Sequence, residues 1–525
     1  WCPKREEGLW DIEYYWGDEL YDDHSDKPEK IQNIYFKLQI LHGLHTVNRN
    51  ERFIEFSEDG KRLKKFNCFF DSEYTIPEGI GVIEDEAFKE CIHLEKVVMP
   101  DSVEIIGNDV FLGCKNLKEI KLSKNLKKIS YGAFLDCINL NSIGIPDSIE
   151  IIEEDAFWGC ENLRKIRLSR NLTMIGDDAF GKCTNLECII WNGKSEEKGV
   201  LRLPEKVKSV GNKTFSSCEK LKKVVLTKSI RKISTNTFEN SSIECIEVDE
   251  DNDMYCSMGG CLFTKDRKKL LCCPKENTIF EVFDETEEIV ARACMGNEKI
   301  RRVDLKNKIK KIGDEAFRNC NGIEVIEKSD VLEEIGNRTF ENCNNLESII
   351  LPKIMKTIGE YAFARCIRMK KIQMPISLQS LGEGAFQQCY SLIYIELPES
   401  CVVVPYKLCE DCYELKEVVF SKETLVIRDK AFANCIMLKR IRNTENIKIL
   451  ENTVFLFCIN LETPQFDEIC KNVLYFDTIL ETERENKSIF MYGYNRNNLR
   501  VEDKNEIERI LGFAKRVRVR DKIEK

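Results

Sequence analysis

The residues that first raise the question of chemistry in this 525-residue chain are its 25 cysteines. Cysteine thiolates bind zinc, form disulfides or act as nucleophiles, and each use demands a particular spacing or partner. The pair Cys409 and Cys412 has the C-x-x-C spacing of metal and redox sites. A second group lies around a predicted hairpin and comprises Cys256, Cys261, Cys272 and Cys273. Its spacing is not a standard zinc pattern, so zinc, a disulfide and free thiols all stay open for this group.

Histidine, the usual partner of a cysteine or serine nucleophile, is scarce in this chain. There are four histidines, all within the first 93 residues, and only His93 falls in the repeated region described below. No G-x-S-x-G motif is present, and Asn192-Gly193-Lys194-Ser195 lacks the earlier glycine of a phosphate-binding loop. We therefore predict a protein that is not an enzyme, with no catalytic residue, no metal site and no cofactor.

Charge and hydropathy narrow the class of partner. The chain has 80 Lys and Arg against 90 Asp and Glu, a formal net charge of −10, whereas dedicated nucleic-acid binders carry a basic excess. No run of 18 apolar residues occurs, so no membrane-spanning helix is expected. We predict a protein partner, with no nucleic acid and no membrane span.

A 23-residue period positions most of the cysteines. Segments of the form small-Phe-x-x-Cys recur fifteen times within residues 76–463, as in Ala133-Phe134-x-x-Cys137. Of the 14 intervals between successive Phe positions, 12 are 23 residues, and the other two are 35 and 56. One such unit cannot bury its apolar side alone, whereas stacked units share a continuous core. The period therefore predicts a solenoid.

Each unit contains three short segments. The L-x-x-I-x-L stretch, such as Leu117, Ile120 and Leu122, alternates like a strand with its apolar residues turned inward. The V-x-x-I-G stretch predicts a second short extended piece, and small-Phe-x-x-Cys predicts one helical or 3-10 turn. The expected fold class is thus an α/β solenoid, strand-rich with short helical or 3-10 turns. Thirteen cysteines occupy the Cys slot and two, Cys294 and Cys409, the Phe slot, so we expect them to be buried thiols packed between coils.

The repeat resembles the BspA-like (Treponema-type) leucine-rich repeat family. The likeness rests on the signature P-x-S-V-x-x-I-G-x-x-A-F-x-x-C, seen in Pro100-Asp101-Ser102-Val103, Ile106-Gly107 and Phe111, and covers about residues 76–463. The resemblance implies a leucine-rich repeat right-handed superhelix of about fifteen 23-residue repeats. It also implies a cell-surface or secreted location and a role in adhesion and protein binding. The thiol content favours a reducing cytoplasm instead, so the compartment stays open.

The repeat boundaries predict four regions. Residues 1–51, aromatic and acidic, form an N-terminal cap or arm, and 52–75 a capping β-hairpin that turns at Asp59-Gly60. The solenoid follows over 76–463, with a hairpin insert at about 249–280 that resembles an insert of the family and turns at Asp266-Arg267. Residues 464–525 form a C-terminal cap with a basic tail and a short helix over 503–515. That helix begins at Asp503 as N-cap and includes Ile507, Ile510, Leu511 and Phe513.

The third and fifth positions of L-x-x-I-x-L should line an exposed sheet face. They form a basic patch and then an acidic stretch, with apolar residues scattered between. The candidate binding residues are Lys121, Lys165, Arg167, Ile190, Glu247, Asp304, Glu327 and Tyr394. Segregated charge with apolar anchors suits a protein ligand. We predict a non-catalytic leucine-rich repeat protein that binds another protein through its curved sheet as a cell-surface adhesin. The alternative is an intracellular scaffold or regulatory subunit of a protein complex.

Overall fold

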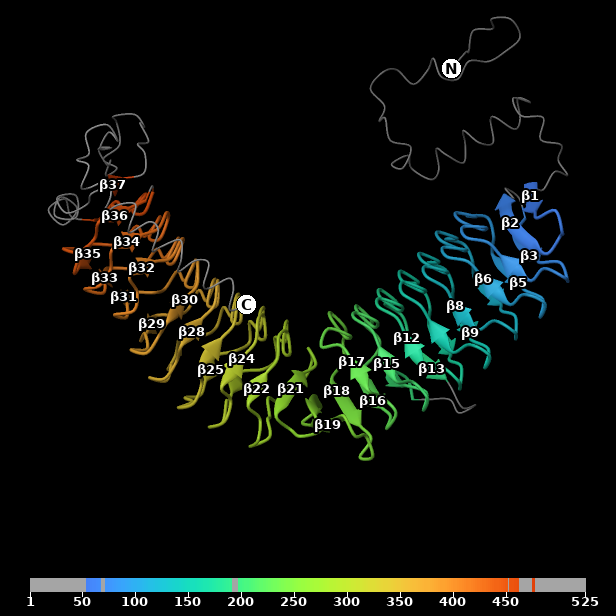
Figure 1. Ribbon diagram of the computed structural model, residues 1–525, viewed down its shortest axis with the longest axis horizontal. Coiled ribbons are helices and arrows are strands. Elements are labelled where there is room, and N and C mark those ends of the chain that lie inside the picture. Colours follow the sequence, from blue (N-terminus) through green and yellow to red (C-terminus); the bar gives the residue numbers. More distant parts are fainter. Residues whose placement is uncertain (1–52, 68–70, 191–196, 452, 462–474, 477–525) are drawn as a thin grey trace, which may run out of the picture.

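The chain stacks its repeats into an open arc (Figure 1), a β-solenoid of about 16 turns. The computed structural model describes residues 53–67, 71–190, 197–451, 453–461 and 475–476. The cap or arm expected over 1–51 and the helix expected at Asp503 lie outside these residues. Within them there is no helix, so the helical or 3-10 turns expected from the sequence, and with them the α/β class, are not found.

The L-x-x-I-x-L segments form one set of parallel strands, which pair between neighbouring coils in five hydrogen-bonded groups along the solenoid. Inward and outward side chains alternate as predicted, with an exposed–buried–exposed pattern in β7, β9 and β11. The strands are β3 (Glu73–Thr75), β5 (Lys96–Val98), β7 (Glu119–Lys121), β9 (Ser142–Gly144), β11 (Lys165–Arg167), β13 (Cys188–Ile190), β14 (Val200–Arg202), β16 (Lys223–Leu226), β18 (Cys245–Val248), β23 (Arg302–Val303), β25 (Val325–Ile326), β27 (Ser348–Ile349), β29 (Lys371–Ile372), β31 (Tyr394–Glu396), β33 (Glu417–Val419) and β35 (Arg440–Arg442). We call this set the first sheet.

The V-x-x-I-G segments form the second sheet, from two-residue strands that also pair in parallel. They are β4 (Val82–Ile83), β6 (Ile105–Ile106), β8 (Lys128–Ile129), β10 (Ile151–Ile152), β12 (Met174–Ile175), β15 (Ser209–Val210), β17 (Lys232–Ile233), β22 (Glu288–Ile289), β24 (Lys311–Ile312), β26 (Glu334–Ile335), β28 (Thr357–Ile358), β30 (Ser380–Leu381), β32 (Val403–Val404), β34 (Val426–Ile427) and β36 (Ile449–Leu450). The strand β37 (Tyr475–Phe476) pairs with β36 at the end of the set.

Two hairpins interrupt the parallel pattern. Strands β1 (Phe53–Phe56) and β2 (Arg62–Asn67) are antiparallel, and β2 then pairs in parallel with β4. The insert consists of β19 (Tyr255–Met258), β20 (Cys261–Thr264) and β21 (Lys269–Cys272), and β20 pairs antiparallel with each of the other two. Because β21 pairs in parallel with β22, the insert joins the two halves of the solenoid. Its side chains divide accordingly, since Leu262 packs into the N-terminal core and Phe263 into the C-terminal one. The capping role of the first hairpin stays a prediction.

The small-Phe-x-x-Cys segment is a series of β-turns, because every second backbone N–H group donates to a carbonyl oxygen of the next coil. In one coil, the N–H groups of Asp109, Phe111 and Gly113 donate to carbonyl oxygens of the next coil at 2.9, 2.9 and 2.8 Å. The intervening N–H groups of Leu112 and Cys114 donate to carbonyls three residues earlier in their own coil, both at 3.1 Å. A helix would direct every donor back along its own segment. Positive φ angles at Asp109 (52°) and Gly113 (69°) aim the alternate donors outward instead.

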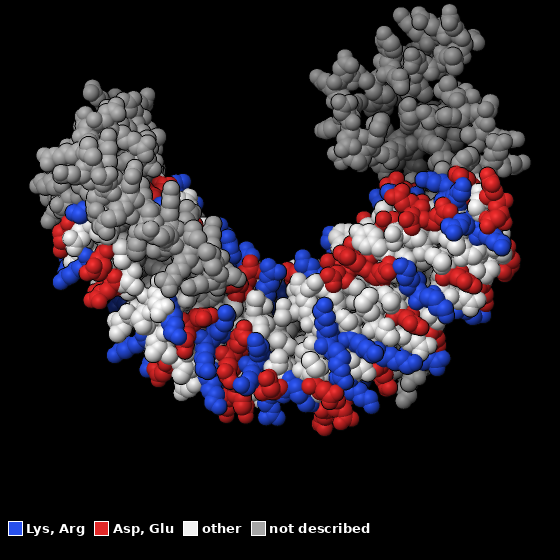
Figure 2. All heavy atoms as spheres, viewed as in Figure 1, with Lys and Arg blue, Asp and Glu red and all other residues white. Residues whose placement is uncertain are grey.

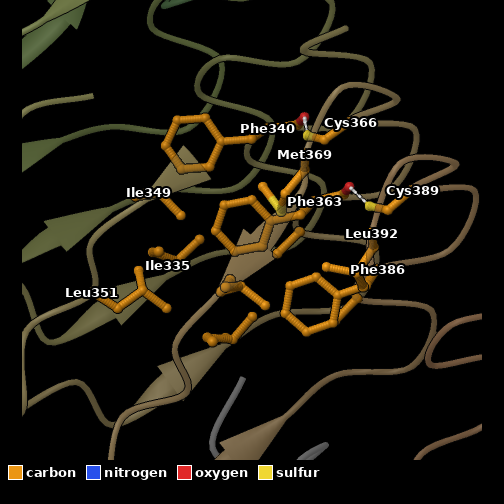
Figure 3. Packing of buried hydrophobic residues seen from close by; sticks show 14 of the residues in the cluster. Ile335, Phe340, Ile349, Leu351, Phe363, Cys366, Met369, Phe386, Cys389 and Leu392 are labelled. Atoms are coloured by element: carbon orange, nitrogen blue, oxygen red, sulfur yellow. Dashed lines mark hydrogen bonds between the residues drawn. The ribbon is translucent and has the colours of Figure 1, made fainter. Parts of the chain in front are cut away.

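A ladder of phenylalanine rings fills the core between the two sheets and these turns. Phe134, Phe157 and Phe180 stack at centroid distances of 5.1 and 5.2 Å with interplanar angles of 6° and 1°. Figure 3 shows the same arrangement for Phe340 and Phe363, whose centroids lie 5.4 Å apart. The ladder thus runs along the solenoid axis, with neighbouring rings at the packing distance of stacked aromatic side chains.

Candidate protein-binding surface

The basic patch predicted from the sequence is one contiguous surface of the first sheet. Lys121 ends β7, and Lys165 and Arg167 lie in β11, all three exposed. Strand β9 lies between them and places Gly144 directly beside Arg167. A Cβ atom added to Gly144 would find no atom within 4 Å, so open space separates the long cationic side chains on either side. Ile190 adjoins the patch, since β13 pairs it with Arg167.

The cationic residues of the patch differ in whether they form ion pairs within the molecule. Arg167 Nη2 lies 3.2 Å from Asp147 Oδ2, and Arg170 Nε donates to the same oxygen at 2.9 Å. The hydrogen bond from Arg170 and the charge of Arg167 hold the pKa of Asp147 below its usual value. Lys121 and Lys165 form no ion pair with any residue that the structure describes. These two ammonium groups are therefore available to an external carboxylate.

The acidic residues predicted on the same sheet are paired within the molecule. Glu247 Oε1 lies 2.6 Å from Lys223 Nζ, and Asp304 Oδ2 lies 3.1 Å from Lys306 Nζ. Glu327 pairs with the guanidinium of Arg302. Figure 2 accordingly shows acidic and basic side chains interspersed along the arc. These three carboxylates do not form an uncompensated patch.

Tyr394 lies apart from the basic patch, in β31 of the C-terminal half. Its hydroxyl donates to Glu396 Oε2 at 2.9 Å, and its side chain is half-buried. The structure therefore places Ile190 with the basic residues and does not bring Tyr394 to them.

A hollow on the second sheet was not anticipated from the sequence. Its volume is about 450 Å³, and its wall includes Tyr131, Met174, Asp177 and Lys232. Tyr131 and Met174 are 39% and 37% exposed. The nearby carboxylate of Asp155 raises the pKa of the Tyr131 phenol, because it disfavours a second negative charge. The sequence signal is Tyr131 itself, which takes a position that Asn108 and Glu154 occupy in the neighbouring coils.

The cysteines with metal-like spacing belong to the repeat. Cys409 and Cys412 are fully buried, and the Cys412 thiol donates to the carbonyl oxygen of Phe386 at 3.1 Å. In the insert, Cys256 donates to the Thr264 carbonyl at 3.3 Å and is a free thiol. Across the described ranges, no three His, Cys, Asp or Glu side chains come together in a way that fits a metal ion. Nor does that part of the chain contain a helix long and apolar enough to cross a membrane.

The Cys slot has a hydrogen-bonding role as well as a packing role. Each of its thirteen thiols donates to a backbone carbonyl oxygen of the preceding coil, at Sγ–O distances from 3.0 to 3.4 Å. Figure 3 shows two of these bonds, from Cys366 to Phe340 and from Cys389 to Phe363. Cysteine suits the slot because it is small, apolar enough for burial and able to donate.

We expect the Cys-slot thiols not to react with iodoacetamide at about pH 8 while the protein is folded. Burial raises the pKa of the Cys-slot thiols Cys160, Cys218 and Cys343. It also raises the pKa of Cys294, in the Phe slot, to about 11. A rise of two units leaves about 100-fold less of the reactive thiolate. Among the described cysteines, the half-buried Cys188 should label first. Peptide mass spectrometry with and without urea measures this, and a slot thiol as reactive as Cys188 would contradict it.

The parallel coils, two sheets and apolar ladder define a leucine-rich repeat solenoid. A family model described as "BspA type Leucine rich repeat region (6 copies)" matches residues 81–199, 198–265, 287–408 and 402–477. The chain therefore belongs to the BspA-type leucine-rich repeat family, as the sequence resemblance indicated.

A search of solved structures found matches that share little sequence with this chain. Pneumococcal vaccine antigen PcpA is 19% identical over 82% of this chain and 99% of its own, with a TM-score of 0.49. A leucine rich cell surface protein from Faecalibacterium prausnitzii is 21% identical over 79% and 95%, with a TM-score of 0.47. A leucine-rich repeat protein from Bacteroides ovatus is 21% identical over 81% and 97%, also at 0.47. None of the curated proteins matches this chain.

Proposed function

We propose that this protein binds a protein partner, without catalysis, through the first sheet at the basic patch around Gly144. The observation that carries the proposal is the pair of exposed lysines beside an open site, Lys121 and Lys165, which form no ion pair with any described residue. Acidic side chains of a partner would enter this space and meet Lys121, Lys165 and Arg167. Charge of this kind steers association, while the adjoining Ile190 offers an apolar contact.

We further propose that the binding serves adhesion at a cell surface. Adhesion and surface location are what membership of the family implies. Coils spaced about 4.8 Å apart over about 16 turns give a rigid surface roughly 75 Å long, which suits a large or extended partner.

Reversing the charge of the patch should abolish most of the binding and spare the fold. The triple variant Lys121→Glu, Lys165→Glu, Arg167→Glu should weaken partner binding at least tenfold, mainly through slower association at low salt. The melting temperature should stay unchanged, because a surface ion pair contributes about 0–1 kcal/mol to stability. Asp147 also retains its hydrogen bond from Arg170 in the variant. Biolayer interferometry with the purified partner measures the first effect, and calorimetry the second.

A matched control reverses three exposed lysines away from the first sheet, Lys220, Lys308 and Lys353. It changes the net charge equally and should leave specific binding within about twofold. If both triple variants weakened binding equally, net charge alone would explain the effect. If the patch variant bound the partner as well as the unaltered protein, the basic patch would be refuted as the binding site.

A further inference from the structure

One slot of the repeat changes character in the C-terminal coils. The residue directly after the Cys slot is mostly polar in the other coils, as in Lys115, Glu161, Thr184, Glu219, Glu298, Asn321 and Asn344. In the last five coils it is apolar or aromatic without exception. These residues, here called the C-terminal apolar row, are Ile367, Tyr390, Tyr413, Ile436 and Ile459.

The row is open to solvent although it is apolar. Tyr390, Tyr413, Ile436 and Ile459 are 36%, 39%, 38% and 60% exposed. The two tyrosine rings stack at 4.9 Å with an interplanar angle of 9°, so they form one continuous surface. A contiguous apolar strip of this kind marks a site that another element covers.

The spacing of the row fits an α-helix that lies along the solenoid axis. The rings of Tyr390 and Tyr413 lie 4.9 Å apart, close to the spacing of about 4.8 Å between paired strands. Residues three or four apart in a helix rise about 4.5 to 6 Å, so apolar side chains at three successive levels of a helix would meet three neighbouring coils. Four coil intervals span about 20 Å, and a 13-residue helix is also about 20 Å long.

The chain contains a segment of this length and pattern beyond the described solenoid. Residues 503–515 are predicted to be helical, and Ile507, Ile510, Leu511 and Ala514 fall on one side of that helix. The described chain reaches Phe476, which pairs with β36 in the end coil, close in sequence to Ile459. The 26 residues between are ample to span the distance from that coil to the row.

We propose that residues 503–515 of this chain form a helix that covers the C-terminal apolar row. Three features favour the chain's own segment over a second copy or another protein. They are the length of the predicted helix, the spacing of its apolar residues, and the position of Phe476 in the end coil. The helix would bury the two stacked tyrosines and extend the core beyond the end of the sheets.

Photo-crosslinking in the full-length protein tests this arrangement. With p-benzoylphenylalanine in place of Leu511, we expect crosslinks within one chain to peptides that contain Tyr413 or Ile436, at a yield independent of protein concentration. The same group in place of Arg509, on the opposite side of the helix, should give at least fivefold less of these products. Crosslinks between chains would overturn the proposal in favour of a second copy, and crosslinks elsewhere or equal yields would overturn docking on the row.

Hydrogen exchange gives an independent readout. In the full-length variant Leu511→Asp, amides of the coils that carry Tyr390 and Tyr413 should exchange at least threefold faster than in the unaltered protein. A synthetic peptide of residues 500–517 should reverse the change, and the same peptide with Leu511→Asp should not. Exchange that is unaffected by the substitution would refute the proposal.

Discussion

Replacing Phe157 with alanine is expected to lower the free energy of unfolding by about 3–5 kcal/mol. The ring is fully buried and stacks on both faces, at 5.1 Å from Phe134 and 5.2 Å from Phe180. The neighbouring coils cannot close the gap, because backbone hydrogen bonds fix their separation on either side. One of these bonds runs from the N–H of Phe157 to the carbonyl of Ala179 at 2.8 Å. The cavity therefore persists, and the cost lies at the upper end of the range for such deletions.

The matched control is the same deletion in the last coils, where Cys409 interrupts the ladder and leaves Phe432 and Phe455 as a separate stacked pair. Phe455 is 8% exposed and, among the described residues, stacks on Phe432 alone, at 5.8 Å, so Phe455→Ala should cost less than half as much. Urea unfolding measures both changes, and hydrogen exchange locates them. In the Phe157→Ala protein, exchange should rise in the coils beside residue 157 and stay unchanged beyond the insert, since each coil contacts only its neighbours. Equal costs at the two positions would contradict the ladder argument.

The sequence was sufficient to predict the solenoid because the period and the strand alternation are properties of single units. Ile143, Ile166 and Ile189 repeat at 23 residues and pair at one register, as the alternation requires. The turn segment was not predictable in the same way. Whether the N–H of Asp109 donates within its coil or to the next depends on the neighbouring coil, and a positive φ at an aspartate is not visible in its residue type.

Some features of the candidate site could likewise be predicted from the sequence and others could not. Exposure of Lys121 and Arg167 follows from strand alternation and could be predicted. Neutralisation of Glu247 by Lys223 could not, because the two residues occupy different columns and meet diagonally across coils. The hydrogen bond of the Cys-slot thiols was also missed, since hydrophobic patterning reports burial and does not report which carbonyl a buried thiol faces.

Asn297 is the position where loss of one polar side chain should cost as much as loss of a core ring. It occupies the Cys slot of the first coil after the insert and is fully buried. Its Nδ2 donates to the carbonyls of Pro274 and Asn277, both at 2.8 Å. Its Oδ1 accepts from the N–H groups of Lys299 and Ile300, both at 2.9 Å. One side chain thus fastens the segment after the insert to the C-terminal half of the solenoid.

We expect Asn297→Ala to lower the free energy of unfolding by about 3–5 kcal/mol. Four backbone groups lose their partner, three of them in buried hydrogen bonds and one, the N–H of Lys299, in a part-buried one. Each buried unsatisfied group costs about 1–3 kcal/mol, partly relieved where water enters. Asn297→Cys should recover less than half of this loss. A thiol supplies the single donor that the slot uses elsewhere, but it cannot replace the amide oxygen that accepts from two N–H groups.

The control is Asn307→Ala, at an exposed asparagine in the next coil, which should change the free energy of unfolding by less than about 0.5 kcal/mol. Urea unfolding compares the three variants, and exchange should rise first around residues 274–277 in Asn297→Ala. Full recovery of stability by Asn297→Cys would show that donation alone matters in this slot. The result expected here shows instead why asparagine replaces cysteine at this coil. Because of the insert, no regular coil precedes this one. The slot residue must therefore form hydrogen bonds with carbonyl groups and with N–H groups that a stacked repeat would otherwise pair.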